Sequence, residues 1–88
     1  MPNSLHDDRY REIIRMLTSE RKKQEITQKQ LSELVHLSQS HLSKIENYER
    51  RIDVLEFFEI IVAMNINIHS FFDNLLKGLF LNPKKANI

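Results

Sequence analysis

Polar side chains recur at helical spacing between residues 39 and 47. At about 100° per residue they project from one side of a helix, roughly opposite Leu42 and Ile45. Glutamine suits adenine, lysine suits guanine, and serine bonds either a base or a phosphate. This chemistry fits hydrogen bonding to nucleic-acid edges, although an ordinary solvated helix face explains the pattern as well. The residues of this face are Gln39, Ser40, Ser43, Lys44 and Asn47.

Charge is unevenly distributed along the chain, although the formal net charge is only +1. Residues 21–51 carry seven basic and four acidic side chains, whereas residues 52–76 carry four acidic and no basic ones. Such a split predicts one positive and one negative face, and a positive face attracts a polyanion. A plain mixture of solvated charges explains the split equally well.

Other kinds of chemistry lack the residues that they need. The chain has no cysteine, and its histidines do not follow the spacing of a zinc site. It also lacks a glycine-rich phosphate loop and a convincing Ser-His-Asp arrangement. We therefore expect no metal, no cofactor and no enzymatic activity. The histidines are His6, His36, His41 and His69.

The length of 88 residues suffices for one domain. The chain begins without the basic start and apolar run of a signal peptide, and it has no apolar stretch long enough to cross a membrane. We therefore expect a cytoplasmic protein. We expect a single domain over residues 1–81 and a flexible tail over residues 82–88, which contains Pro83, Lys84 and Lys85.

Five helices and no strand are expected, because the one glycine and the two prolines lie near the termini. Capping boxes of the form Thr27-x-x-Gln30 and Asp53-x-x-Glu56 indicate where two helices begin. Asn65 suits the left-handed position that ends the fourth helix. The five expected N-caps are Asp7 or Asp8, Thr27, Ser38, Asp53 and Asn67.

Apolar periodicity predicts which side of each helix is buried. The predicted core residues are Tyr10, Ile13, Ile14 and Leu17 in the first helix, Leu31, Leu34 and Val35 in the second, Leu42 and Ile45 in the third, Val54, Leu55, Phe58, Ile61 and Val62 in the fourth, and Phe72, Leu75 or Leu76 in the fifth.

The fourth and fifth helices offer more apolar surface than a monomer of this size needs. Phe57, Ile60 and Met64 lie off the predicted buried side of the fourth helix. A thick core is the simple explanation, but we favour a homodimer interface, since small domains often gain stability by association. Its predicted residues are Phe57, Ile60, Phe71, Leu79 and Phe80.

Residues 26–47, ITQKQLSELVHLSQSHLSKIEN, resemble the helix-turn-helix of the phage-repressor-like, or Xre, family. The Thr-Gln-x-x-Leu start, the Ser-Gln-Ser opening of the third helix and the Ser-Lys-Ile-Glu-Asn ending are specific in combination. The similarity continues over roughly residues 9 to 76. It implies an all-α, five-helix repressor-like bundle whose central helix-turn-helix binds double-stranded DNA in the major groove.

The resemblance also implies roles for individual residues. Arg21 and Glu46 match positions that form a semi-buried salt bridge between the first and third helices. It implies that Gln28 contacts a phosphate and braces Gln39. Gln39, Ser40 and Lys44 would contact base edges, with Ser43 nearby. Asn47 and Arg50 or Arg51 would contact the DNA backbone.

Glycine is common in the family at three positions that hold Glu25, His36 and Tyr48 here. We expect a left-handed backbone at His36, in the turn between the second and third helices, where a side chain carries a cost.

We therefore predict a sequence-specific DNA-binding transcriptional regulator, a dimeric repressor acting on an inverted-repeat operator. Two alternatives stay open. One is an antitoxin of the same fold that binds DNA and a toxin. The other is a protein-interaction adaptor that has lost DNA binding, with which Glu49 and the missing glycines are compatible.

Overall fold

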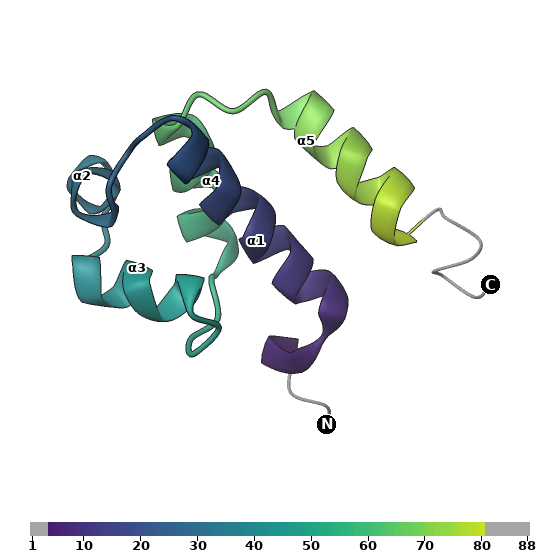
Figure 1. Ribbon diagram of the computed structural model, residues 1–88, viewed down its shortest axis with the longest axis horizontal. Coiled ribbons are helices and arrows are strands. Elements are labelled where there is room, and N and C mark those ends of the chain that lie inside the picture. The colour runs from purple at the N-terminus through teal and green to yellow at the C-terminus, as the bar shows by residue number, and fades with distance from the viewer. Residues whose placement is uncertain (1–3, 81–88) are drawn as a thin grey trace.

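Five α-helices and two short helical turns form the part of the chain that the computed structural model describes, residues 4–80 (Figure 1). The turn η1 (Ser4–His6) is a 3-10 helix, and η2 (Leu76–Phe80) is a π-helical turn that continues the last helix. Residues 4–80 contain no strand, so the all-α prediction is confirmed. The predicted tail, residues 82–88, lies outside the described residues. The helices are α1 (Asp8–Lys23), α2 (Gln28–Leu34), α3 (Gln39–Glu46), α4 (Val54–Ala63) and α5 (Ile68–Leu75).

Side-chain caps begin every α-helix at a predicted residue. Thr27 Oγ1 accepts a hydrogen bond from Gln30 N–H at 3.0 Å, and Gln30 Oε1 accepts one from Thr27 N–H at 2.9 Å. Asp53 and Glu56 form the same reciprocal pair at the start of α4. A cap of this kind typically stabilises a helix by about 1 kcal/mol. The other three caps are Asp7, Ser38 and Asn67.

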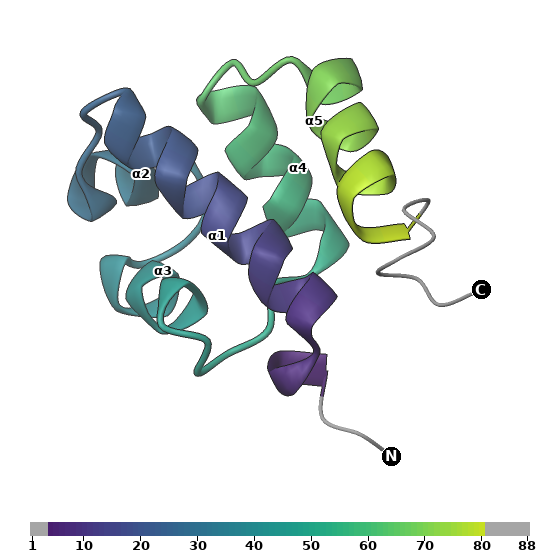
Figure 2. The ribbon, with the colours of Figure 1, turned by 45° about the vertical axis from the view of Figure 1, so that its right-hand side comes forward.

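The helices surround one core. In Figure 1, α1 passes in front of α4, while α2 and α3 lie together at the left. The second view shows α5 running beside α4, on the side away from α2 and α3 (Figure 2). The core residues between them are Ile14, Leu17, Leu31, Val35, Leu42, Ile45, Ile60, Ile61, Met64, Phe71 and Leu75.

The buried side of α4 differs from the prediction. Ile60 and Met64 are 2% and 3% exposed, whereas Leu55 and Val62 are 72% and 77% exposed. Because α4 is apolar almost all the way round, its periodicity is compatible with more than one buried face, and its packing against α1 and α5 decides between them. The predicted core residues that are exposed instead are Leu34, Val54, Leu55, Phe58 and Val62, together with Phe72 and Leu76.

Two residues predicted to form a dimer interface lie in the core of the single chain. Ile60 is 2% and Phe71 7% exposed, because α5 folds onto α4 and brings the Phe57 ring to 5.9 Å from that of Phe71. The prediction that Ile60 and Phe71 face outward was therefore wrong. Phe57 and Leu79 are half-buried against the same core. The Phe80 side chain lies outside what the structure describes.

Three residues other than glycine have a left-handed backbone: Glu25 (φ 59°), Tyr48 (φ 62°) and Asn65 (φ 53°). Each follows the end of a helix, and Asn65 was predicted. His36 is not among them, because α2 ends on an extended Val35 (φ −123°, ψ 173°). The expectation of a left-handed His36 was wrong, so the turn that aims α3 does not require glycine at that position.

Candidate nucleic-acid interface

The outer face of α3 carries polar side chains that point away from the core. Leu42 and Ile45 are 1% and 2% exposed, and they fix the rotation of the helix against α1 and α2. On the other side, Gln39, Ser40 and Lys44 are exposed and Ser43 is half-buried. Within residues 4–80, none of these four side chains bonds to another protein group. Their donors and acceptors are therefore free to meet a ligand.

A buried ion pair holds α3 in place. Arg21 Nε donates to Glu46 Oε2 at 2.8 Å and Arg21 Nη2 donates to Glu46 Oε1 at 2.9 Å, with each side chain 9% exposed. Arg21 Nη1 also donates to the Ile26 carbonyl at 2.6 Å. One guanidinium thus joins α1, the α1–α2 connection and the last turn of α3. The expected semi-buried salt bridge is present.

Gln28, in the first turn of α2, completes this cluster. Its Nε2 donates to Glu46 Oε1 at 2.8 Å. Within the described residues the side chain makes no hydrogen bond to Gln39, so the implied bracing is not seen in the chain by itself. Gln28 is half-buried beside the end of α3, and it adds a third donor to the Glu46 carboxylate.

The loop between α3 and α4 is anchored to α1 at two points. Ile52 N–H donates to the Tyr10 hydroxyl at 2.9 Å, and the Arg11 guanidinium lies 4.7 Å from the centre of the Tyr48 ring. Burial raises the pKa of Tyr10. Neither contact was predicted from the sequence. Tyr10 was predicted only as a core residue, and Tyr10 and Ile52 are 42 residues apart, so their hydrogen bond leaves no local sequence pattern. The loop presents Asn47, Arg50 and Arg51 as exposed side chains.

Two further links between α4 and the helix-turn-helix were also missed. His36, in the α2–α3 turn, pairs through Nδ1 with Glu59. His41 of α3 brings Nε2 to 3.6 Å from Glu56 Oε2, and that nitrogen is buried without a hydrogen-bond partner. The His36 side chain is exposed and that of His41 is half-buried between α3 and α4. No group of three His, Asp or Glu within residues 4–80 is arranged to hold a metal ion.

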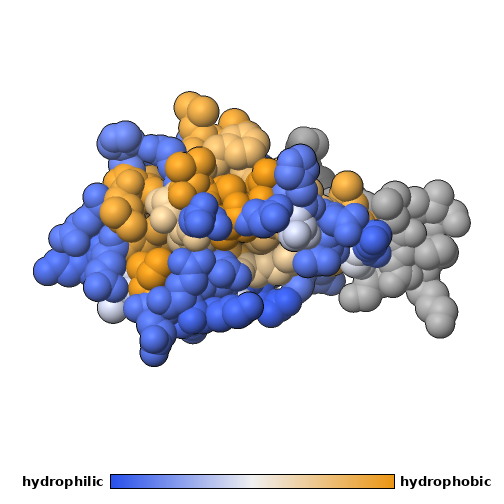
Figure 3. Space-filling model, turned by 90° about the horizontal axis from the view of Figure 1, so that it is seen from above, coloured by the Kyte–Doolittle hydropathy of each residue, from blue (hydrophilic) through white to orange (hydrophobic). Residues whose placement is uncertain are grey.

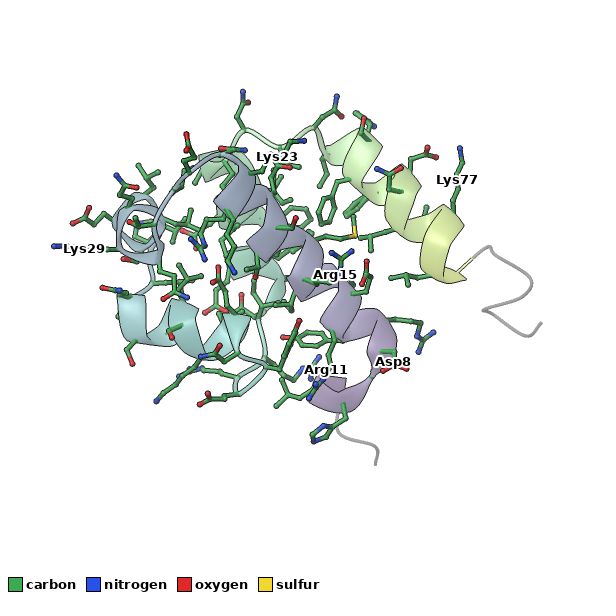
Figure 4. The ribbon with its side chains drawn as sticks, viewed as in Figure 1. Asp8, Arg11, Arg15, Lys23, Lys29 and Lys77 are labelled. Atoms are coloured by element: carbon green, nitrogen blue, oxygen red, sulfur yellow. The ribbon has the colours of Figure 1, made fainter. Side chains whose placement is uncertain are left out.

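Of the seven basic residues that were predicted to contribute to a positive face, six are exposed, whereas Arg21 is buried in the ion pair with Glu46. Figure 4 shows Lys29 pointing outward from α2 and Lys23 at the end of α1. Two acidic residues of residues 52–76 bind groups close to them in the sequence. Asp53 caps α4, and Asp73 pairs with Lys77 at 3.2 Å. The exposed cations of residues 21–51 are Lys22, Lys23, Lys29, Lys44, Arg50 and Arg51.

Comparison with known proteins identifies this arrangement. The model of a helix-turn-helix family matches residues 17–71, from the middle of α1 into α5, which is more than half of the chain. No curated protein matches the chain. No helix within residues 4–80 combines the length and the apolar character that crossing a membrane requires. The family is one of DNA-binding regulatory domains. With α2 and α3 as its two central helices, the chain belongs to the Xre-like helix-turn-helix family of DNA-binding transcription regulators.

Proposed function

We propose that the protein is a transcriptional repressor that binds an inverted-repeat operator as a homodimer, with α3 as the reading helix. The observation that carries this proposal is the outer face of α3. Within residues 4–80 its polar side chains make no hydrogen bond to another protein group, and no carboxylate lies among them. A helix of this kind fits the major groove, where base edges offer the matching donors and acceptors.

The first turn of α3 supplies most of the sequence choice. The Gln39 amide donates and accepts at once, which matches adenine, and the Ser40 hydroxyl bonds a base or a phosphate. Lys44, one turn further along the same face, suits guanine. Ser43 lies beside them at the rim of the contact.

Backbone contacts come from the two ends of the motif. Asn47, Arg50 and Arg51 follow α3 on the loop that Tyr10 anchors, and their charges or amides suit phosphate oxygens. Gln28 reaches a phosphate only with the donor that its bond to Glu46 leaves free. These contacts set the register of the protein on the duplex.

A dimer doubles the contact that one α3 can make. Two reading helices about 34 Å apart meet successive major grooves on one side of the duplex, so half-sites lie about 10 base pairs apart. Occupying such an operator blocks a promoter that overlaps it.

The test is a selection of bound sites from random duplex DNA, followed by a salt titration on the selected sequence. Inverted repeats are expected, with a log–log salt slope near −0.9 for each phosphate neutralised. Arg50→Ala should make that slope shallower by about one. The matched control is Lys77→Ala, because Lys77 lies on η2 and pairs with Asp73. No selected sequence, or an affinity that ignores salt, would contradict the proposal and favour the adaptor.

A further inference from the structure

An open hollow of about 360 Å³ lies between α1 and the end of α3. We name it the α1–α3 hollow. We propose that it binds one phosphate of the DNA backbone, in addition to the phosphates contacted by Gln28 and by the loop after α3. This proposal rests on the proposed function, because it extends the same DNA interface onto α1. The lining residues of the α1–α3 hollow are Arg15, Thr18, Ser19, Lys22, Glu46 and Tyr48.

The side chains around the α1–α3 hollow offer donors that suit a phosphate. Lys22 is exposed, and within residues 4–80 its ammonium group makes no bond to another protein group. Arg15 bonds Glu12 through Nε and Nη2, so its Nη1 stays available as a donor. Arginine, lysine and hydroxyl side chains are among the groups that bond DNA phosphates. Within the same residues, three hydroxyl groups have no hydrogen-bond partner, those of Thr18, Ser19 and Tyr48.

The charge of the α1–α3 hollow favours an anion. Among the lining residues that the structure describes, Glu46 alone is acidic, and its carboxylate already accepts two hydrogen bonds from Arg21 and one from Gln28. The buried pair of Glu46 with Arg21 is close to neutral, and so is the surface pair of Arg15 with a glutamate of its own helix. Lys22 therefore determines the sign of the charge, which is positive.

The α1–α3 hollow lies between the two groups of backbone contacts that the proposed function assigns. On one side, Glu46 accepts the hydrogen bond of Gln28, in the first turn of α2. On the other side, Tyr48 directly follows Asn47 and begins the loop that carries Arg50. A DNA strand whose phosphates meet both groups passes the hollow between them.

Tyr48 forms one wall of the hollow in a strained conformation. Its φ is 62°, a left-handed value that is costly for a bulky side chain and that glycine adopts without strain. The Arg11 guanidinium lies 4.7 Å from the centre of the Tyr48 ring, and Arg11 and Arg15 follow one another along α1 (Figure 4). Backbone strain of this kind concentrates at functional sites. A glycine here, as is common in the family, would leave the hollow without this wall and without the phenol hydroxyl.

The surroundings of the α1–α3 hollow are polar. Figure 3 shows hydrophobic residues gathered over one area of the surface, with hydrophilic residues along its border. Within residues 4–80, none of the large apolar side chains that remain exposed lies on α1 or α3. A charged ligand such as a phosphate therefore suits this hollow better than an apolar one.

Salt titrations of DNA binding test the contribution of Lys22. Lys22→Gln should weaken binding about 5- to 10-fold at about 0.1 M salt, the factor for one neutralised phosphate, and make the log–log slope shallower by about one. The loss should be equal on the selected operator and on unrelated duplex DNA, because a phosphate contact carries no sequence information. Lys23→Gln is the matched control, since Lys23 is the next residue of α1 but lines a different hollow, beside α5. It removes the same charge and should change the affinity and the slope less than Lys22→Gln does.

Tyr48 variants test the wall of the hollow. Tyr48→Phe keeps the ring and its contact with Arg11 but removes the hydroxyl, so DNA affinity should fall about 3- to 10-fold while the urea midpoint stays unchanged. Tyr48→Gly should also weaken DNA binding, although it relieves the left-handed strain. A glycine variant that binds DNA as tightly as the wild type contradicts the inference.

Neutral methylphosphonates at single positions of the operator locate the contact. At one phosphate in each half-site, the substitution should weaken binding by the wild-type chain but weaken binding by Lys22→Gln no further, because the two changes remove the same interaction. Wild-type binding that Lys22→Gln and Tyr48→Phe both leave unchanged, in affinity and in slope, overturns this inference and leaves the proposed function standing. A wild-type chain that binds no duplex DNA refutes both.

Discussion

Replacing Arg21 by alanine tests how the structure holds its reading helix. The guanidinium donates three hydrogen bonds of 2.6–2.9 Å, two to Glu46 and one to the Ile26 carbonyl. Both charged side chains are 9% exposed, so Arg21→Ala leaves a carboxylate buried with Gln28 as its only partner. Breaking a buried pair from one side typically costs about 3–5 kcal/mol. A domain of this size has roughly 4–13 kcal/mol of stability in total.

The chain contains a matched control on the same helix. Arg15 also pairs with a glutamate, Glu12, but the Arg15 side chain is 59% exposed. Exposed pairs contribute about 0.2–1 kcal/mol, so Arg15→Ala should change stability little. Urea unfolding followed at 222 nm, at one fixed protein concentration, compares the two variants. Arg21→Ala should lose several times more free energy of unfolding than Arg15→Ala.

A double substitution separates the buried charge from the packing around it. Arg21→Met with Glu46→Met removes both charges and keeps apolar volume, and such replacements are often neutral or stabilising. The double variant should therefore be more stable than Arg21→Ala. The reasoning is refuted if Arg21→Ala and Arg15→Ala cost the same, since the pair would then act as a surface salt bridge.

Three other changes probe single contacts. Glu25→Gly should raise the free energy of unfolding by about 0.5–1 kcal/mol, because glycine removes the strain of a φ of 59°, and an unchanged or lower urea midpoint would contradict this. Tyr10→Phe should lower stability by about 1–2 kcal/mol and weaken DNA binding, because Ile52 N–H loses its acceptor; an unchanged midpoint would show that water replaces the hydroxyl. Arg9 donates a hydrogen bond to the Asp7 carboxylate and holds the pKa of Asp7 at about 2, below the usual 3.8. The contribution of ionised Asp7 to the free energy of unfolding is therefore complete above about pH 4 and is lost as the pH falls through 2. Asp7→Asn keeps a capping oxygen and should flatten the Asp7-dependent part of the acid titration, and an identical titration would refute that assignment.

The helix starts were predictable because capping is a local event. The bonds at Thr27 and Asp53 join residues three positions apart, so the pattern in the sequence and the contact in space coincide. The same holds for Asn65, whose left-handed backbone follows from its own side chain. The outer face of α3 was found because Leu42 and Ile45 mark its opposite side clearly.

The buried face of α4 was not predictable from its own residues. Val54 to Ala63 is apolar in all but two positions, so the sequence does not distinguish the side that meets Ile14 and Leu17 from the side that meets water. The anchoring of Ile52 by Tyr10 depends on how α1 crosses the bundle. Such contacts between distant residues can be predicted only once the positions of the helices relative to one another are known.

Base readout by α3 is the central claim, and competition binding with substituted operators tests it most directly. On the selected operator, Gln39→Ala and Lys44→Ala should each lose preference at one position in each half-site, by about 1–3 kcal/mol, and keep preference elsewhere. Ser70→Ala, an exposed change on α5, should keep the full wild-type preference. If both Gln39→Ala and Lys44→Ala select the wild-type operator with undiminished preference at every position, α3 does not read the bases, and the account is contradicted.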